Sequence, residues 1–229
     1  MKFSLMTTLA AGLAAGLATS ALASGPVTVY EPPIVPFVPA TYDWSGFYAG
    51  LHVGTLLDNN NWAERSGPVA NTPGDWGGTP WGLTAGYNMQ SGAMVYGAAF
   101  DYTGGTLTAN STTGGGFFCV GGTCTTTVEN GFAIRGRIGR AFDRTLIYAT
   151  AGLASGDATG FAGVTTGQDR LTGWTAGIGI EHAVSDVVSL NLEYLYTDLG
   201  RLELPTACGV NCYTDVNYGT VRLGVNFNF

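Results

Sequence analysis

The chain has 229 residues and a formal net charge of −7 at pH 7, and only 11% of its residues are charged. Soluble domains typically contain about 25% charged residues. The acidic balance argues against a nucleic-acid partner, which would require a basic face. Lys2 is the only lysine. Because soluble sheets commonly protect their edges with lysine, this composition disfavours a sheet whose exterior faces water.

The amino-terminal region has the features of an export signal. Residues 1–23 combine Lys2, an apolar stretch and a small-residue cleavage site at Ala21–Ala23, which is typical of a secretory signal peptide. Residues 24–42 contain five of the nine prolines, and we interpret them as a periplasmic leader. No later run approaches the roughly 20 apolar residues of a membrane helix, so residues 43–229 would have to cross a membrane as strands.

From residue 43 onward the chain alternates between apolar and polar residues in eight segments, a period of two that indicates β-strands. In each segment one face carries large apolar side chains, whereas the other carries small or charged ones. The segments are Trp44–Leu56, Thr79–Met89, Ala93–Thr103, Val128–Phe142, Thr145–Ser155, Arg170–His182, Val187–Thr197 and Thr220–Phe229. The last one alternates without interruption up to Phe229. Something must therefore cover a fully apolar stripe at the end of the chain, and lipid is a candidate.

The connections between these segments alternate in length. Those at 88–92, 142–144 and 183–186 are short, whereas those at 57–78, 104–127, 156–169 and 198–217 are long. Short periplasmic turns, long extracellular loops and strands of about ten residues are typical of outer-membrane barrels. We therefore predict an all-β fold, an eight-stranded antiparallel up-and-down transmembrane β-barrel.

Alternation alone would also fit a secreted, lipocalin-like barrel with an apolar interior. Two observations favour lipid outside. The polar face is rich in glycine and carries charges of both signs, which suits the narrow lumen of an eight-stranded barrel. Aromatic residues also gather towards strand ends, as in the interfacial belts of membrane proteins. We predict two belts, one periplasmic (Trp44, Phe47, Tyr87, Tyr96, Phe142, Phe227, Phe229) and one outer (Trp81, Phe100, Tyr102, Phe132, Trp174, Tyr194, Tyr196).

Charged residues on the predicted inner face are expected to form a buried ion network. Its members are Asp101, Arg135, Arg137, Glu181, Glu193 and Arg222. Unpaired charges in the lumen would be costly, so pairing that fills and rigidifies the barrel is the simpler interpretation. The functional alternative is a gated ion or proton path.

The four cysteines form two closely spaced pairs within long connections. In an exported protein an even number of cysteines favours disulfides, here Cys119 with Cys124 and Cys208 with Cys212, although three connectivities are possible. A zinc site is the alternative, but the spacing is not Cys-x2-Cys. We expect no metal and no cofactor.

Only His52 and His182 could serve as a histidine base. His52 is expected to face the lumen near the outer end of the first strand, where a lipid-modifying enzyme would need it, but no serine or aspartate motif identifies its partners. His182 directly follows Glu181, but adjacent residues of a strand point to opposite faces, so Glu181 is not expected to orient it. We therefore predict no enzymatic activity.

Three stretches of the chain resemble small outer-membrane β-barrel proteins of alphaproteobacteria. These stretches are Tyr42–Leu51, Arg135–Thr150 and Ser189–Gly200. Such proteins are described as porin-family or surface-antigen proteins and are related in fold to OmpA- and OmpX-type barrels. The resemblance implies export to the outer membrane of a Gram-negative bacterium and insertion by the barrel assembly machinery, with Phe229 as part of the assembly signal. Relatives are described as surface antigens, envelope-stabilising proteins or haemin binders.

The expected function is thus that of a non-enzymatic integral outer-membrane protein. Its barrel would be a scaffold in outer-membrane lipid, and its loops could meet an extracellular ligand or a host surface. One alternative is binding of haemin or another small apolar ligand by loop aromatics, namely Trp62, Trp76, Phe117, Phe118 and Tyr213. The other is a narrow channel, although eight strands leave no wide aqueous pore.

Overall fold

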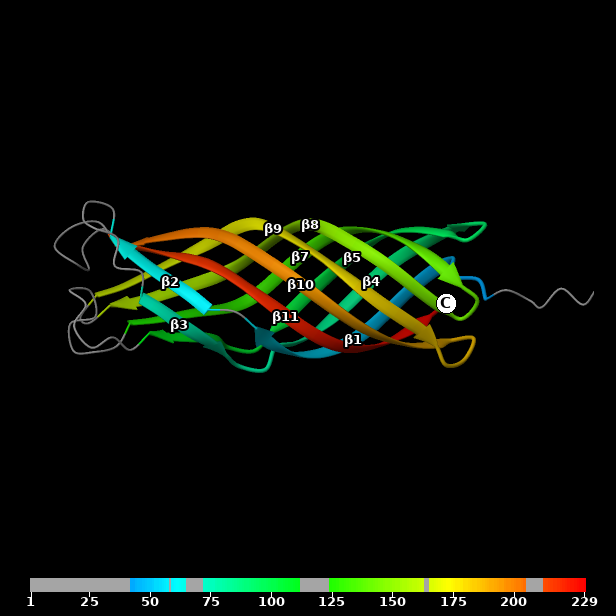
Figure 1. Ribbon diagram of the computed structural model, residues 1–229, viewed down its shortest axis with the longest axis horizontal. Coiled ribbons are helices and arrows are strands. Elements are labelled where there is room, and N and C mark those ends of the chain that lie inside the picture. The colour runs from blue at the N-terminus through cyan, green and yellow to red at the C-terminus, as the bar shows by residue number, and fades with distance from the viewer. Residues whose placement is uncertain (1–41, 58, 65–71, 112–123, 163–164, 205–211) are drawn as a thin grey trace, which may run out of the picture. The chain divides into compact units, whose positions relative to one another are not determined.

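The computed structural model describes residues 42–57, 59–64, 72–111, 124–162, 165–204 and 212–229. The predicted signal peptide and nearly all of the predicted leader lie outside these ranges. The described residues form eleven antiparallel strands (Figure 1). They are β1 (Gly46–Leu57), β2 (Asn59–Glu64), β3 (Thr72–Gly77), β4 (Trp81–Ser91), β5 (Met94–Gly104), β6 (Leu107–Ser111), β7 (Cys124–Phe142), β8 (Thr145–Ala162), β9 (Thr165–Ala183), β10 (Val188–Leu204) and β11 (Cys212–Asn228). Within them, no helix is long and apolar enough to cross a membrane.

Eight of the strands close a ring, which confirms the predicted eight-stranded barrel. The order is β1-β4-β5-β7-β8-β9-β10-β11, and β11 pairs back with β1 from Tyr48↔Asn228 to Leu57↔Gly219. Each backbone edge in this ring therefore has a neighbour, as hydrocarbon requires. The start of β1 and the carboxyl terminus lie at the same end of the barrel, together with the short turns (Figure 1).

The long connections differ from the prediction, because they are not simply loops. The strands β2, β3 and β6 lie within the connections at 57–78 and 104–127, and β7 to β11 extend well beyond their predicted ends. Above the first ring, β2, β3 and β6 close a second ring with the same five long strands: β11 pairs with β2, β2 with β3, β3 with β6 and β6 with β7. The barrel wall thus continues past the level at which β1, β4 and β5 end. We call the two levels the lower ring and the upper ring.

Glycines mark the breaks between the two rings. Gly78 and Gly105 have φ angles of +122° and +92°, which favour glycine. A Cβ on Gly78 would also lie 2.6 Å from the carbonyl oxygen of Thr106. The chain can therefore break between β3 and β4 and, beside it, between β5 and β6, without leaving a wide gap in the barrel wall.

The two faces of the lower ring follow the predicted division. Large apolar side chains point outward over all eight strands and remain exposed, among them Leu51, Leu83, Ile134, Ile178 and Leu223. This is the arrangement expected when lipid covers the exterior. Inside the upper ring, by contrast, the core is apolar, as in a soluble protein, with Leu107, Val128, Leu202, Leu204 and Val216 almost fully buried.

The end of the barrel that carries the short turns is closed by a second apolar cluster. Trp44, predicted to lie in the periplasmic aromatic belt, is instead buried at 3% exposure, and its ring packs edge-on against that of Tyr42, with 4.8 Å between the ring centroids. The hydroxyl of Tyr42 donates to the carbonyl of Asp186. At this same end of the barrel, hydrogen bonds from the backbone amide and the side chain of Ser45 hold the pKa of the Asp43 carboxyl below its ordinary value. The first residues of the barrel therefore plug its own lumen.

Candidate functional site

The centre of the lumen holds a cluster of four charged side chains, which we call the central cluster: Asp101, Arg135, Glu193 and Arg222. Arg135 donates from Nε to Asp101 at 2.8 Å and from Nη1 to Glu193 at 2.8 Å. Arg222 donates from Nε to Glu193 at 2.6 Å and from Nη2 to Asp101 at 3.1 Å. All four are at least 94% buried. The four groups form a closed square in which each arginine binds both carboxylates.

The central cluster crosses the barrel. Asp101 and Arg135 come from neighbouring strands β5 and β7, whereas Glu193 and Arg222 come from β10 and β11. Every contact between these two pairs therefore joins walls that are not hydrogen-bonded to each other. Alternating residues of a strand share a face, so the period of two in the sequence is what aims these side chains inward.

A second ion pair, the lower cluster, lies towards the turn end. Arg137 Nη2 donates to Glu181 at 2.8 Å, and the other oxygen of Glu181 accepts from Ser189 at 2.6 Å and Asn226 at 2.8 Å. The guanidinium of Arg137 also stacks on Tyr148, 4.0 Å from the ring centroid. The six charged residues predicted for the lumen therefore divide into two clusters instead of one network.

The sequence did not single out the neutral members of these clusters. The inward face of the strands also carries Ser189, Asn226 and Tyr148. The alternation of inward and outward positions in the sequence could therefore have identified them. Inward glycines make room for the tyrosine rings: a Cβ on Gly86 would lie 2.5 Å from the hydroxyl of Tyr48, and one on Gly179 the same distance from that of Tyr148.

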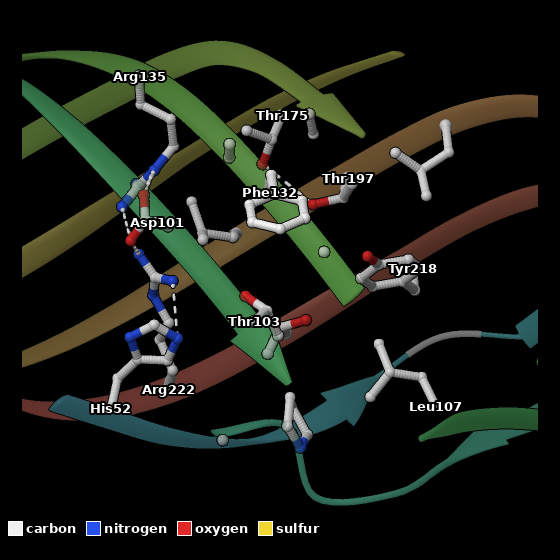
Figure 2. A pocket seen from close by; sticks show the side chains of 18 of the residues that line it. His52, Asp101, Thr103, Leu107, Phe132, Arg135, Thr175, Thr197, Tyr218 and Arg222 are labelled. Carbon is white, nitrogen blue, oxygen red and sulfur yellow. Dashed lines mark hydrogen bonds and ion pairs between the residues drawn. The ribbon is translucent and has the colours of Figure 1, made fainter. Parts of the chain in front are cut away.

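A small cavity lies above the central cluster. Its volume is about 60 Å3, and it lies between the charged floor and the apolar core of the upper ring. Figure 2 shows His52, Asp101, Arg135 and Arg222 on one side, with Thr175, Thr197, Tyr218 and Leu107 further along the pocket. A cavity of about 20 Å3 lies between the two clusters. At about 10–15 Å3 per water, the larger space holds about four to six waters and the smaller one about one or two.

His52 lies in the lumen, as predicted, and joins the edge of the central cluster. Its Nε2 is 3.4 Å from Arg222 Nη1, and its Nδ1 is 3.3 Å from the hydroxyl of Thr84. That hydroxyl donates to Asp101 at 2.7 Å. A nucleophile would have to give its proton to the histidine, but the hydroxyl of Thr84, which is hydrogen-bonded to His52, gives its proton to a carboxylate instead.

The other predicted site residues are described only in part. Cys124 is buried at the start of β7, and β11 begins at Cys212. Cys119 and Cys208 lie outside the described residues, so both disulfide pairings stay predictions. The described residues include no free cysteine and no group of three His, Cys, Asp or Glu side chains that could hold a metal ion. Phe229 is exposed at 81% beside the start of β1, and its amide donates to Phe47.

Of the loop aromatics predicted to bind a ligand, only Trp76 and Tyr213 have described side chains, and Trp76 is buried. Trp76 is buried in the upper ring, where its Nε1 donates to the carbonyl of Asn217 at 2.9 Å and its ring packs on Tyr218. Tyr213 lies elsewhere, under the guanidinium of Arg201 at 3.9 Å. Phe117 and Phe118 lie outside the described residues, as does the side chain of Trp62. The prediction that Trp76 is available to an extracellular ligand is therefore wrong.

Comparison with known proteins agrees with this architecture. Residues 9–229 match the family described as "Outer membrane protein beta-barrel domain". The chain is 33% identical to the 31 kDa outer-membrane immunogenic protein of Brucella melitensis biotype 1, over 96% of this chain and 98% of that protein. It is 30% identical to the 25 kDa outer-membrane immunogenic protein of Brucella abortus biovar 1, over 94% and 95%.

The fold is also similar to a solved structure. The outer membrane protein OprG of Pseudomonas aeruginosa superimposes with a TM-score of 0.56 at 14% sequence identity, covering 81% of this chain and 96% of that one. At this identity the likeness concerns the fold alone. Together with the apolar exterior and the match over nearly the whole sequence, it shows that the chain belongs to the outer membrane protein β-barrel family and resides in the outer membrane of a Gram-negative bacterium.

Proposed function

We propose that this protein is a closed, non-enzymatic scaffold of the outer membrane that contributes to envelope integrity and presents its upper ring to the surroundings. The observation that carries this proposal is the filled lumen. Three arginines face three carboxylates in two buried clusters, and apolar cores close the barrel above and below them. A barrel built for transport would keep a continuous water-filled path.

The energetics of the central cluster support a closed barrel. An ion crossing the lumen would have to separate buried ion pairs, at a cost of several kcal/mol for each charge left without its partner. The pairs also tie β5 and β7 to β10 and β11, so they resist flattening of the barrel. The same groups thus seal the lumen and brace its walls.

Conductance in planar lipid bilayers tests this function directly. The purified, folded barrel is expected to insert without producing discrete conductance steps, because its cavities of about 60 and 20 Å3 are separated by the central cluster. An unrelated porin inserted under the same conditions serves as the positive control. Uniform steps from the wild-type barrel would show that it is a channel and would overturn the proposal.

The upper ring is the part that would meet the surroundings. Relatives of this chain are named outer-membrane immunogenic proteins. Such a name fits a protein with a surface that extends beyond the membrane. The outward faces of β7 to β10 in this ring carry polar and charged residues, including Glu129, Asp157, Gln168 and Arg201. Extracellular partners would bind there or on the connecting loops.

Cysteine labelling on intact cells tests this orientation. A Gln168→Cys variant in the upper ring is expected to react with a membrane-impermeant maleimide, whereas Ser91→Cys, at the end of β4 next to a short turn, should react only after the outer membrane is permeabilised. The wild-type protein gives the background from its own cysteines. Labelling of Ser91→Cys alone in intact cells would mean the opposite orientation.

Biogenesis forms part of the same proposal. β11 ends at the carboxyl terminus, with outward Leu223, Val225 and Phe227 followed by Phe229. Such a terminal apolar strand fits recognition by the barrel assembly machinery. The side chain of Phe229 is 81% exposed.

A further inference from the structure

The lipid-facing surface of the lower ring is not uniform, because a groove of about 630 Å3 crosses it over β4, β5, β7 and β8. Small residues form its floor, among them Ala98, Gly136, Ala149 and Ala151. The register explains the hollow: Ala98 lies opposite Gly136, and Gly136 opposite Ala151, so three neighbouring strands carry no large side chain at one level. Its volume lies within the range of about 300–1,000 Å3 typical of ligand pockets.

Larger side chains border the groove on two sides. Met89 from β4, Tyr96 from β5 and Ile138 from β7 line it on the side nearer the short turns, whereas Tyr87 from β4 pairs with Ala98 and borders the floor at the same level. All four point outward and are substantially exposed. The groove is therefore apolar throughout its outward face and lies in the part of the barrel that hydrocarbon surrounds.

A single unpaired charge lies just below this groove. Arg140 is two residues from Ile138 on the same outward face of β7, a distance of about 7 Å along the strand. Among the arginines of the described ranges, Arg140 alone has no carboxylate within 4.0 Å, whereas each of the others has one. Its guanidinium stands over the ring of Phe142, 5.4 Å from the centroid, and its side chain is exposed.

The position of Arg140 indicates where an anionic group would bind. It precedes the turn at Asp143 by three residues, at the end of the barrel that carries the short turns, which is the periplasmic end in outer-membrane barrels. A charged side chain at this depth is costly unless it reaches the interface or a partner of opposite charge. Phosphate is such a partner, because it accepts charge-assisted hydrogen bonds from a guanidinium.

We propose that this face binds one anionic glycerophospholipid of the inner leaflet. Its phosphate accepts hydrogen bonds from Arg140, and one acyl chain lies in the groove over Ala98, Gly136 and Ala151. The groove and the charge make different contributions to selectivity. The groove accepts the acyl chain of any lipid, whereas the unpaired Arg140 favours a headgroup with a net negative charge. The site is independent of the lumen and of whatever the upper ring binds.

Native mass spectrometry tests the proposal on the full-length mature barrel. The protein is folded into vesicles of phosphatidylcholine and phosphatidylglycerol in equal amounts, extracted into detergent and stripped by repeated washing. The wild type is expected to retain one phosphatidylglycerol in preference to phosphatidylcholine. Arg140→Gln should lower the retained phosphatidylglycerol about tenfold, the loss expected for one charge-assisted bond.

Two pairs of variants separate the site from general effects. Arg201→Gln removes the same charge from the upper ring and should retain lipid as the wild type does. Ala151→Phe fills the groove and should abolish retention, whereas Ala85→Phe, outward on β4 but outside the groove, should not. Equal retention of the two lipids by the wild type, or unchanged retention in Arg140→Gln or Ala151→Phe among barrels shown to be folded, would overturn the proposal.

Discussion

Replacing Arg135 with methionine is expected to lower the free energy of unfolding by about 3–5 kcal/mol. Arg135 donates to both Asp101 and Glu193, at 2.8 Å to each, and the two carboxylates are only 2% and 3% exposed. Its removal leaves two carboxylates with only Arg222 to neutralise them. Urea titration of the barrel folded into vesicles measures the change, with the heat-dependent shift between folded and unfolded bands on SDS gels as a second readout.

The matched control for this variant is Arg201→Met. Arg201 also pairs with a carboxylate, that of Asp215 at 3.0 Å, but both side chains are at least 40% exposed. An exposed pair contributes about 0–1 kcal/mol, so the control should unfold almost as the wild type does. Adding Glu193→Gln to Arg135→Met restores charge balance and should recover part of the loss. A loss below about 1 kcal/mol in Arg135→Met would show that the central cluster does not brace the barrel.

Replacing Gly152 with valine is expected to prevent the barrel from folding. Gly152 lies on β8 opposite Arg135, and a Cβ there would overlap the carbonyl oxygen of Ile134 and lie 2.6 Å from the Cα of Arg135. Both are main-chain atoms of β7, which cannot rotate away as a side chain can. Overpacking a core typically costs about 1–3 kcal/mol, and a collision between paired backbones costs more.

Gly136→Val tests whether this effect belongs to the inward position. Gly136 is on β7, one residue from Arg135, but it faces outward, and the nearest atom to a Cβ there is 3.9 Å away. This variant should fold and should keep the heat-dependent mobility shift on SDS gels. Folding of Gly152→Val with wild-type stability would mean that the two strands can separate locally without cost.

The lower ring could be predicted from the sequence because lipid imposes a strict rule. Each strand there has one lipid face and one lumen face, so a period of two runs through every segment and places Asp101, Glu193 and Arg222 inside. Which charges meet could not be predicted in this way. Arg135 reaches Glu193 across the lumen, and that contact depends on strand tilt and stagger, which local alternation does not encode.

The upper ring could not be predicted because its strands do not have one lipid-facing and one polar, lumen-facing side. Its wall separates water from an apolar core, so Trp76 and Leu107 point inward where a lumen would be polar. The strands β2, β3 and β6 are only five or six residues long and rich in Asn, Thr and Gly, a composition also typical of loops. Their stability comes from pairing with the long strands β7 and β11 more than from their own propensity.

Trp44 shows a related limit. A tryptophan at a strand end is typical of an interfacial belt, but this one turns inward and closes the mouth of the barrel with Tyr42. Because it precedes the first ladder pair of β1, at Gly46, strand alternation does not determine its direction.

The glycine breaks at Gly78 and Gly105 have a consequence for how such a surface can diversify. Strands β8, β9 and β11 pass from one ring to the other in unbroken register, whereas β7 and β10 shift register between Glu129 and Phe132 and between Asp198 and Arg201. In the unbroken strands an inserted residue would reverse the faces of everything beyond it. At the breaks the strand register starts anew on each side. A change in the length of the chain there leaves the lower ring unchanged. On the side formed by β1, β4 and β5, the exterior can therefore be remodelled under selection from the environment while the part in lipid keeps its pattern.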